Sequence, residues 1–329
     1  MGRRELRVRR ESWPIAGTFR IARGAKTVAE VVVAEIHEGT HVGRGECAPY
    51  ARYGQSVDGT VEAIEALGAD VAAGLNRSAL QDRLPASAAR NALDCALWDL
   101  DAKVAERRAW ELEGLAAPGV LTTAFTLGID SLEALGAAAR TQAHRPLLKI
   151  KLAGDGDDVA RVRAVRDGAP AARIVVDANE SWTEATFSEL AQELAALGVL
   201  LIEQPLPEGR DACLSSVPHP VPLCADESCH GLTALPELVG RYDVINIKLD
   251  RTGGLTEALR VRAEARRLGL GVMVGCIVGT SLAMAPALLV AAGADFVDLD
   301  GPLLLARDRD PGLRYDGSEV HPPDAALWG

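Results

Sequence analysis

The sequence predicts an α/β protein in which a modified (β/α)8, or TIM-like, barrel follows a smaller α+β domain. From about Thr122 onward, eight short apolar runs alternate with longer, alanine-rich stretches of helical periodicity. Each strand-and-helix unit covers roughly 20–30 residues, which is typical of such a barrel. In the preceding residues, strand-like sequence patterns come first and helix-like patterns follow, as in a separate α+β unit. Polar residues also end most of the eight apolar runs.

The first 115 residues are expected to form the α+β domain, which would cap the barrel. Alternating apolar and polar residues predict strands at 4–9, 28–37 and 41–46. Helical periodicity predicts helices at 57–74 and 87–108. His37 and His41 have helical metal-site spacing, but they flank a Glu-Gly turn, so we expect a solvated hairpin there.

Residues 116–309 are expected to form the barrel, and residues 310–329 a polar tail that packs back on the first domain. An open, doubly wound sheet is the structural alternative. It usually carries a glycine-rich phosphate fingerprint after its first strand, but Gly128-Ile-Asp-Ser follows here. The expected strands are 122–128, 147–152, 173–177, 199–203, 221–225, 244–248, 271–275 and 296–299.

Composition limits the function classes. The chain has 329 residues and a net charge of −11, which argues against a nucleic-acid partner. No apolar run is long enough for a membrane helix, and no apolar segment follows the basic start, so a cytoplasmic protein is expected. Six scattered cysteines are then expected to be reduced thiols. The sequence leaves open whether the chain forms a homo-oligomer.

Three acidic residues end three successive apolar runs: Asp177, Glu203 and Asp226. In a barrel the carboxyl ends of the strands converge on one mouth, so these side chains would become neighbours. Three carboxylates in one pocket repel one another unless a cation neutralises them, and oxygen ligands favour Mg²⁺. The alternative is that each residue caps the helix that follows it.

Two further strands end in lysines. Lys149 and Lys151 are two residues apart and therefore share one face of a strand, and Lys248 ends the sixth strand, across the barrel. Lysines flanking a metal could remove a proton from one face of a carbon and return it to the other. Lys151 must be neutral for that role, and Lys149 and the metal would supply the positive charge that favours the neutral form. The alternative is that a slipped turn leaves the lysines solvated.

These residues resemble the enolase superfamily, muconate-lactonizing subgroup, over essentially the whole chain. The motifs are Lys149-Ile-Lys151, Asp177-Ala-Asn179, Glu203-Gln-Pro205, Asp226-Glu-Ser228 and Asn246-Ile-Lys248-Leu-Asp250, with Trp13-Pro, Ile21-Ala-Arg-Gly24, Gly45-Glu-Cys-Ala-Pro-Tyr50 and the Ala89–Leu100 segment. Within the subgroup the chain is most similar to dipeptide epimerases. The resemblance implies an isomerase that binds Mg²⁺ through Asp177, Glu203 and Asp226.

The implied reaction inverts the α-carbon of the second residue of a dipeptide such as L-Ala-L/D-Glu. Lys151 and Lys248 would transfer the proton through an enolate, while Lys149 tunes Lys151. Asn179 and Glu227 would support the metal ligands, and Asp250 would orient Lys248. The resemblance also implies a place in murein peptide metabolism.

The resemblance assigns the substrate's ends as well. Asp298 and Asp300 would hold the free ammonium of the dipeptide, since charge-assisted hydrogen bonds to two carboxylates suit a cation. Arg23, expected on a mobile first-domain loop, would hold a carboxylate, with Arg20, Lys26 and Arg52 as rivals. Cys276 is also expected among the substrate-binding residues.

Two classes of alternative remain. The same scaffold could serve an N-acylamino-acid racemase, an o-succinylbenzoate synthase or a cycloisomerase, whose substrates lack the ammonium that the paired aspartates would bind. A metal-containing barrel that only binds peptides is the second alternative. Complete acid–base lysines argue against it, because binding alone does not need them.

Overall fold

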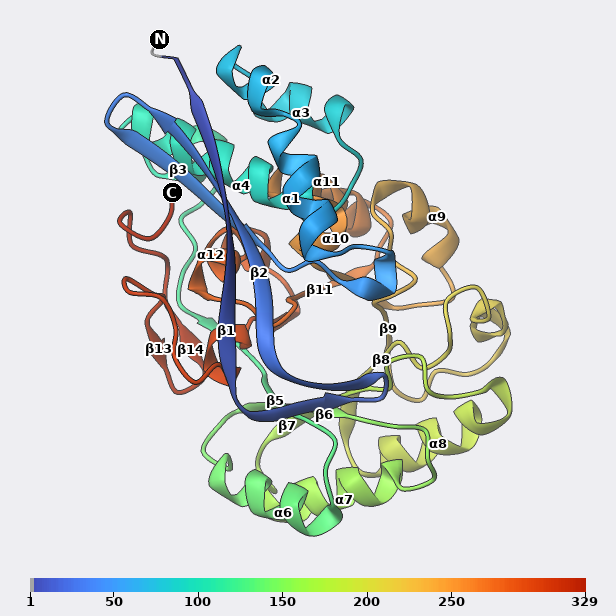
Figure 1. Ribbon diagram of the computed structural model, residues 1–329. Helices are drawn as coiled ribbons and strands as arrows, with labels where there is room; N and C mark the ends of the chain where they lie inside the picture. Colours follow the sequence, from blue (N-terminus) through green and yellow to red (C-terminus); the bar gives the residue numbers. More distant parts are fainter. Residues whose placement is uncertain (1–2) are drawn as a thin grey trace.

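The computed structural model describes residues 3–329, which form an antiparallel sheet with helices and an eight-stranded parallel barrel (Figure 1). The expected fold class is confirmed. The barrel strands are hydrogen-bonded in chain order from β5 to β12. At the seam the backbone N–H of Ala124 donates to the carbonyl of Val297 at 2.8 Å, so the first and last strands meet.

The first domain is built from three strands and five helices. They are β1 (Glu5–Ile21), β2 (Gly24–Glu38), β3 (His41–Cys47), α1 (Val57–Glu65), α2 (Gly68–Ala72), α3 (Arg77–Arg83), α4 (Ala88–Val104) and α5 (Ala109–Leu112). The expected strand 4–9 continues to Ile21, the expected helix 57–74 is divided between α1 and α2, and the expected helix 87–108 ends at Val104.

The length of β1 has a local explanation. Pro14 and Gly17 interrupt the apolar alternation, so the sequence indicates no strand beyond residue 9. In the structure the pairing of β1 with β2 shifts register between Pro14 and Phe19, and Gly17 has a φ of 88°. The irregularity thus bends the strand without ending it. The resulting hairpin runs across the barrel, where the N–H of Ile129 donates to the carbonyl of Arg20 (Figure 1).

All eight expected barrel strands are present. The elements after the first domain are β4 (Leu121–Thr122), β5 (Phe125–Leu127), α6 (Leu132–Thr141), β6 (Leu147–Lys151), α7 (Asp158–Gly168), β7 (Arg173–Asp177), α8 (Glu184–Ala196), β8 (Val199–Glu203), β9 (Leu223–Ala225), α9 (Leu235–Leu238), β10 (Val244–Ile247), α10 (Leu249–Thr252), α11 (Leu255–Arg267), β11 (Gly271–Gly275), α12 (Ser281–Ala291), β12 (Phe296–Asp298), α13 (Gly301–Leu304), β13 (Tyr315–Asp316) and β14 (Glu319–Val320).

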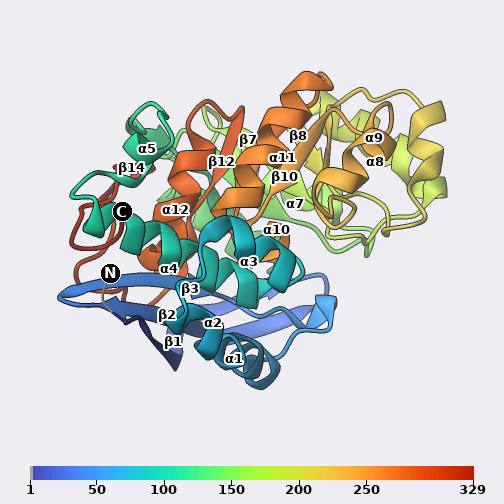
Figure 2. The same cartoon turned by 90° about the horizontal axis from the view of Figure 1, so that it is seen from above.

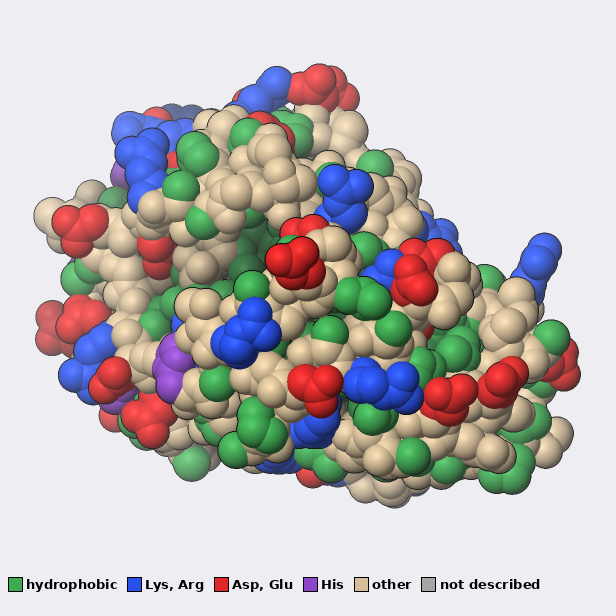
Figure 3. Space-filling model, turned by 90° about the horizontal axis from the view of Figure 1, so that it is seen from below, with side chains coloured by type: hydrophobic (Ala, Val, Ile, Leu, Met, Phe, Trp, Pro, Cys, Tyr) green, Lys and Arg blue, Asp and Glu red, His purple; other side chains and the backbone are tan. Residues whose placement is uncertain are grey.

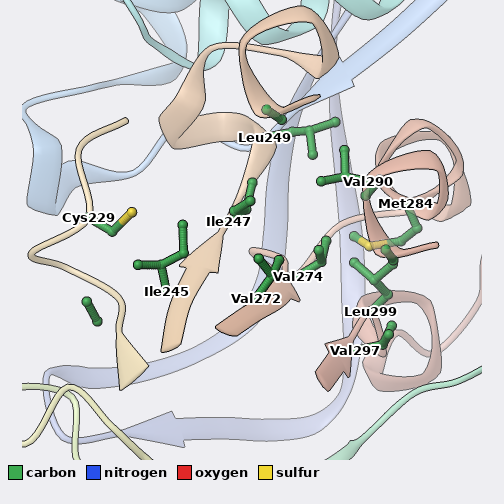
Figure 4. Packing of buried hydrophobic residues seen from close by; sticks show 14 of the residues in the cluster. Cys229, Ile245, Ile247, Leu249, Val272, Val274, Met284, Val290, Val297 and Leu299 are labelled. Carbon is green, nitrogen blue, oxygen red and sulfur yellow. The ribbon is translucent and has the colours of Figure 1, made fainter. Parts of the chain in front are cut away.

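The period of two along each strand separates the two apolar layers of the barrel. Outward-facing residues pack under the helices: Ile245, Ile247 and Val274 belong to the same buried cluster as Val290 of α12 (Figure 4). Inward-facing residues form a separate buried cluster: Ala124, Leu147, Val175, Leu201, Cys224, Val244 and Met273. Because alternate residues share a face, the residues two and four positions later on these strands also point inward.

Helix α4 lies between the first-domain sheet and the barrel (Figure 2). Two glycines of β3 allow the sheet to approach it: a Cβ on Gly43 would lie 2.2 Å from the carbonyl oxygen of Ala96, and one on Gly45 would lie 2.1 Å from that of Ala92. On its other side, Asp94 accepts from the N–H of Thr256 in α11 at 2.9 Å. The helix therefore joins the two parts rigidly.

The C-terminal segment also contacts the first domain. The indole N–H of Trp328 donates to the carbonyl of Cys95 in α4 at 3.0 Å, and the N–H of Gly329 donates to Asp99 at 2.7 Å. Within residues 3–329, no helix combines the length and apolarity needed to cross a membrane. On the face shown in Figure 3, acidic and basic side chains are interspersed with hydrophobic ones.

Candidate active site

The polar residues of the barrel lie directly above its apolar interior layer. Asp177, Glu203 and Asp226 each come two residues after an interior residue of β7, β8 or β9. Lys149 and Lys151 follow Leu147 on β6 at the same period, and Asn246 and Lys248 follow Val244. The same alternation that fills the barrel floor with apolar side chains therefore directs these groups into its mouth.

The three carboxylates converge. Asp177, Glu203 and Asp226 are buried, and one oxygen from each lies within 4.8 Å of those of the other two. The backbone N–H of Asn179 donates to Asp177 Oδ1 at 2.9 Å, and the side-chain amide of Asn246 donates to Glu203 Oε1 at 2.7 Å. These hydrogen bonds orient the carboxylates of Asp177 and Glu203.

This donor set fits a hard divalent cation. Three buried carboxylates supply only oxygen ligands and a formal charge of −3, which suits Mg²⁺ better than a softer transition metal. Burial and Asp177 raise the pKa of Glu203 to about 7, as expected where acids crowd together without a metal. The triad is therefore the part of the barrel that can hold a metal ion.

The two outer lysines approach the triad from opposite sides. Lys151 Nζ lies 2.5 Å from Asp177 Oδ2, and Lys248 Nζ lies 2.7 Å from Asp226 Oδ2. Lys151 belongs to β6, and Lys248 follows β10, four strands further around the eight-stranded sheet. Two ammonium groups thus face one carboxylate cluster across the barrel.

Lys149 has a different environment from the one expected. Its Nζ lies 2.5 Å from Glu203, 2.7 Å from Asp298 and 3.4 Å from Asp177. Burial by itself would lower the pKa of Lys149, but these carboxylates outweigh it and hold the pKa well above its ordinary value. The charge of Lys149 is therefore balanced by acids.

A cavity of about 630 Å³ opens above these groups, between the barrel mouth and the first domain. The expected site residues Asn179, Glu227, Asp298, Asp300, Cys276 and Arg23 all line it, together with Lys149, Lys151, Asp226 and Lys248. Cys276 is partly exposed as a residue. Desolvation of its thiol, together with the nearby Asp300, raises the pKa of the thiol well above the ordinary value. The structure thus brings strand ends and first-domain residues to one space.

The two aspartates at the end of β12 have unequal environments. Asp298 Oδ2 accepts from Lys149, whereas Asp298 Oδ1 has no hydrogen-bond partner among the described residues. Asp300 Oδ2 accepts from the N–H of Thr126 at 2.6 Å, and burial together with Asp298 raises the pKa of Asp300 to about 7. Both residues line the cavity, and Asp298 Oδ1 is a buried acceptor whose hydrogen bond is unmade among the described residues.

Arg23 lies at the two-residue tip of the β1–β2 hairpin, not on an open loop as expected. Its guanidinium lies 2.5 Å from Glu227 Oε1 and 3.0 Å from Glu180 Oε2, and it donates to the carbonyl of Asn179 at 2.9 Å. Glu227 and the carbonyl of Asn179 therefore hold the hairpin tip on the barrel, while the N–H of Asn179 also donates to Asp177, one of the candidate metal ligands. Of the rival cations, Lys26 and Arg52 line the cavity and Arg20 lies outside it.

The expected role of Asp250 is not what the structure shows. Asp250 Oδ1 accepts from the N–H of Ala48 at 3.0 Å and from the amide of Asn91 at 2.8 Å, so its partners belong to the first domain. It stands two residues after Lys248, but α10 begins between them and turns the side chain away. Asp250 therefore joins the domains, and none of the hydrogen bonds it accepts among the described residues comes from Lys248.

Two models of known families match the chain. The model of the mandelate racemase / muconate lactonizing enzyme N-terminal domain matches residues 3–114, and the enolase C-terminal domain-like model matches residues 133–326. The chain belongs to the mandelate racemase / muconate lactonizing enzyme family. The resemblance to the enolase superfamily is thereby confirmed.

Relatives within this family are named epimerases or racemases. The L-Ala-D/L-Glu epimerase of Escherichia coli (strain K12) is 45% identical over 97% of this chain and 99% of its own. The N-acetyl-D-glutamate racemase of a Pseudoalteromonas species is 45% identical over 91% of this chain and 95% of its own.

Solved structures of the family agree with the fold. An enolase family member from Agrobacterium tumefaciens, described as having homology to dipeptide epimerases and bound sodium and L-Ala-L-Glu, is 52% identical, with a TM-score of 0.97 over 99% of this chain and 100% of its own. A dipeptide epimerase from Methylococcus capsulatus, complexed with Mg and L-Arg-D-Lys, is 30% identical, with a TM-score of 0.89 over 97% of each chain.

Sequence reasoning about this family member missed two buried groups. Arg251 donates to both the carbonyl and the Oδ1 of Asp226, and it contacts the hydroxyl of Tyr53 at 3.2 Å. Asn246 lies inside a quoted motif without a stated role, yet it holds Glu203. The period of two before Lys248 could have identified Asn246. Arg251 had no such signal, because only the turn of α10 directs it inward.

Proposed function

We propose that the protein is a Mg²⁺-dependent dipeptide epimerase that inverts the α-carbon of the second residue of a dipeptide such as L-Ala-L/D-Glu. The observation that carries this proposal is the pair Lys151 and Lys248, which face one buried triad of carboxylates from opposite sides of the barrel. A single base could remove a proton but would return it to the same face. Two bases on opposite faces allow the configuration to invert.

Asp177, Glu203 and Asp226 are the residues that would hold the metal. When bound, Mg²⁺ neutralises the triad and stabilises the negative charge that develops on the substrate carboxylate as the α-proton leaves. Lys151 pairs with Asp177 and Lys248 pairs with Asp226, and the two lysines would act as general base and general acid: one accepts the α-proton while the other donates a proton to the opposite face. Their separation around the sheet supports a role for them on the two faces of the α-carbon of a substrate bound between them.

The other end of the substrate is assigned to β12. Asp298 and Asp300 line the cavity, where an N-terminal ammonium would complete the hydrogen bonds of their carboxylates. Arg23 closes the hairpin over the mouth through Glu180 and Glu227, which helps to exclude water from the reacting centre. Cys276 contributes a weakly polar wall beside the aspartates.

The direct test is proton exchange in heavy water. Incubation with L-Ala-L-Glu and L-Ala-D-Glu should incorporate one deuterium at the glutamyl α-carbon and interconvert the two diastereomers, as followed by NMR. Binding of the dipeptides without deuterium incorporation would instead favour a peptide-binding barrel. A chain treated with excess chelator serves as the control for uncatalysed exchange.

N-acylglutamate racemisation is the second candidate. A relative named N-acetyl-D-glutamate racemase is as similar in identity as the named L-Ala-D/L-Glu epimerase, which favours considering it. The two activities differ in whether an ammonium meets Asp298 and Asp300. Comparing kcat/KM for L-Ala-L-Glu and N-acetyl-L-Glu in the same exchange assay decides between them.

The proposal extends to the cellular role. A dipeptide epimerase acting on Ala-Glu would belong to murein peptide metabolism, and we assign it to the cytoplasm. This extension is supported by the family resemblance and is tested by whether deletion of the gene leaves L-Ala-D-Glu unconsumed in cell extracts.

A further inference from the structure

A buried glutamine stands among the strand ends that carry the candidate metal ligands. Gln204 directly follows Glu203 at the end of β8, and it is fully buried. It is not among the described residues that line the cavity, so it does not touch a substrate there. Its φ is 36°, in the left-handed region that residues other than glycine rarely adopt. A backbone held in that region costs free energy, which other contacts of the residue must offset.

The turn at Gln204 moves its backbone carbonyl out of the ladder between β8 and β9. The N–H of Gln204 donates to the carbonyl of Cys224 at 2.8 Å, as the parallel pairing of these strands requires. A straight strand would next direct the Gln204 carbonyl to the N–H of Asp226. Instead, that carbonyl accepts from the N–H of Glu180 at 2.9 Å, in the loop after β7. The buried N–H of Asp226 therefore needs another acceptor, because an unpaired one is costly.

The side chain of Gln204 supplies that acceptor. Its Oε1 accepts from the N–H of Asp226 at 2.9 Å and from the N–H of Ser228 at 3.1 Å. Because a backbone N–H can only donate, these two bonds determine which end of the amide is the oxygen. The side-chain carbonyl thus takes the place of the backbone carbonyl and extends the ladder by one more bond. The residue held by that bond carries a carboxylate of the triad.

The other end of the amide is anchored in a buried polar network. Gln204 Nε2 lies 2.9 Å from Ser228 Oγ, 3.0 Å from the Tyr242 hydroxyl and 2.9 Å from the carbonyl of Leu206. Both hydroxyls donate to Asp211 Oδ2, at 2.7 and 2.8 Å, so their own oxygens are left to accept from Nε2. All these side chains are buried, where such a chain of hydrogen bonds is strengthened by the low dielectric. The network therefore keeps the amide in one orientation.

We propose that Gln204 is the positioning residue that sets the geometry of the metal triad. Its backbone continues from Glu203 and holds the loop that follows Asp177, and its side chain holds the backbone from which Asp226 projects. One residue thereby couples all three carboxylates, which must keep their separation to bind one ion. The inference rests on the proposed function, in which the triad holds Mg²⁺, and it adds the group that keeps the three ligands together.

The test shortens the amide in one variant and removes it in another. Gln204→Asn keeps an amide and suits a left-handed backbone, but its side chain is a methylene too short to reach the N–H of Asp226. Gln204→Met keeps the length of the side chain and loses the acceptor. In both variants the affinity for Mg²⁺, measured by calorimetric titration, should fall by roughly ten- to a hundred-fold, the usual cost of losing a group that orients a metal ligand. Urea unfolding measures separately how far each variant is destabilised.

Gln81→Met is the matched control. Gln81 of α3 is also partly shielded from solvent and also uses its amide, donating to the carbonyl of Arg77 at 3.0 Å and to Asp94 at 3.1 Å. These partners belong to the first domain and not to the strand ends of the triad. The control should lose unfolding free energy and keep the Mg²⁺ affinity of the wild type. It therefore separates a general loss of stability from a change in the geometry of the triad.

The outcomes for the inference and for the proposed function are distinguishable. Folded Gln204→Asn and Gln204→Met variants that bind Mg²⁺ as tightly as the wild type would overturn the role of Gln204, whatever their turnover. An equal loss of Mg²⁺ affinity in Gln81→Met would overturn it as well. Weakened Mg²⁺ binding in the two Gln204 variants of a chain that exchanges no dipeptide proton would support the role of Gln204 and refute the epimerase. Failure of the wild type to bind Mg²⁺ would overturn both.

Discussion

At the scale of single residues, the site depends on where each charge finds its counter-charge. Asp226 contacts two cations at once, because Lys248 pairs with Oδ2 and Arg251 with Oδ1. Burial by itself would raise the pKa of Asp226, but Arg251 and Lys248 outweigh it and hold the pKa well below its ordinary value. Asp226 therefore stays ionised and available to a metal even though it is buried.

Replacement of one metal ligand should weaken metal binding and catalysis together. Asp226→Asn removes one of three anionic ligands, so we expect Mg²⁺ affinity to fall by at least about tenfold. Loss of a residue that only hydrogen-bonds a metal ligand already lowers metal affinity by about this factor. Calorimetric titration with Mg²⁺ and the exchange assay measure the two effects. Asp82→Asn, an exposed carboxylate of α3, is the control and should behave like the wild type. Full activity in excess chelator would contradict the metal assignment.

The two lysines should be separable by stereochemistry. Lys151→Ala and Lys248→Ala should each abolish net epimerisation, because each removes one of two bases. Each variant should retain exchange with only one configuration of the α-carbon, and the two preferences should be opposite. The rate of exchange with the other configuration should fall by about 10²–10⁴-fold, as is usual for loss of a general base. Wild-type interconversion in either variant would refute the two-base mechanism.

At the scale of elements, the period of two on the strands builds floor and site together. Leu147, Val175 and Leu201 fill the interior layer, and the residues two positions later are Lys149, Asp177 and Glu203. A slip of one residue in any strand would exchange the inner and outer faces. The strand register therefore determines whether the catalytic groups point into the barrel. Ile245 and Ile247, packed under the helices, hold Asn246 and Lys248 inward (Figure 4).

The contact between β3 and α4 should be sensitive to a single methyl group. In Gly45→Ala the new Cβ would lie 2.1 Å from the carbonyl oxygen of Ala92, so the sheet or the helix must move. We expect a loss of about 1–3 kcal/mol or more in the free energy of unfolding, as for other overpacked cores. Urea unfolding followed by circular dichroism measures it. Gly68→Ala at the start of α2 has open space and should be neutral or slightly stabilising.

At the scale of the whole molecule, buried ionic contacts hold the first domain on the barrel. Glu46 of β3 accepts from the N–H of Thr280 at 2.8 Å and pairs with Arg309 at 2.7 Å, and Arg309 also pairs with Glu11 of β1 at 2.5 Å. The Glu46 carboxylate of the first domain thus contacts two separate segments of the barrel domain, at Thr280 and at Arg309. Since the cavity lies between these domains, the same network keeps the hairpin over the site.

Removal of Arg309 should destabilise the fold in a pH-dependent way. Arg309→Met leaves the buried Glu46 carboxylate without its cation, which costs about 3–5 kcal/mol. Burial already raises the pKa of Glu46, and Arg309 opposes that rise, so the variant's pKa is higher still. A folded pKa above the unfolded value means that the folded state binds the proton more tightly, so stability falls as the pH rises between the two values.

The free energy of unfolding of Arg309→Met should therefore approach that of the wild type as the pH is lowered. Urea unfolding at several pH values between mildly acidic and mildly basic conditions measures this trend. The double variant Glu46→Gln, Arg309→Met is the control, because it has no buried carboxylate left to titrate. Its loss of unfolding free energy relative to the wild type should change little with pH. If the loss in Arg309→Met alone were equally independent of pH, the role assigned to Glu46 would be contradicted.

The sequence by itself determined the barrel and the central groups of its site. Strand periodicity is local, so eight apolar runs predicted eight strands, and strand-end positions predicted that Asp177, Glu203 and Asp226 would meet. The hairpin β1–β2 was underestimated because Pro14 and Gly17 interrupt its alternation, although pairing with β2 carries the strand through.

Only the tertiary structure decided which charges neutralise one another. Asp250 was expected to face Lys248 but binds Ala48 and Asn91, and Arg251 reaches Asp226 without any motif to announce it. Glu180 and Glu227 pair with Arg23 at the hairpin tip. The physical reason is that an ion pair depends on distance and burial between residues far apart in the chain. Local sequence sets which face a side chain points to, and the folded chain sets what it meets there.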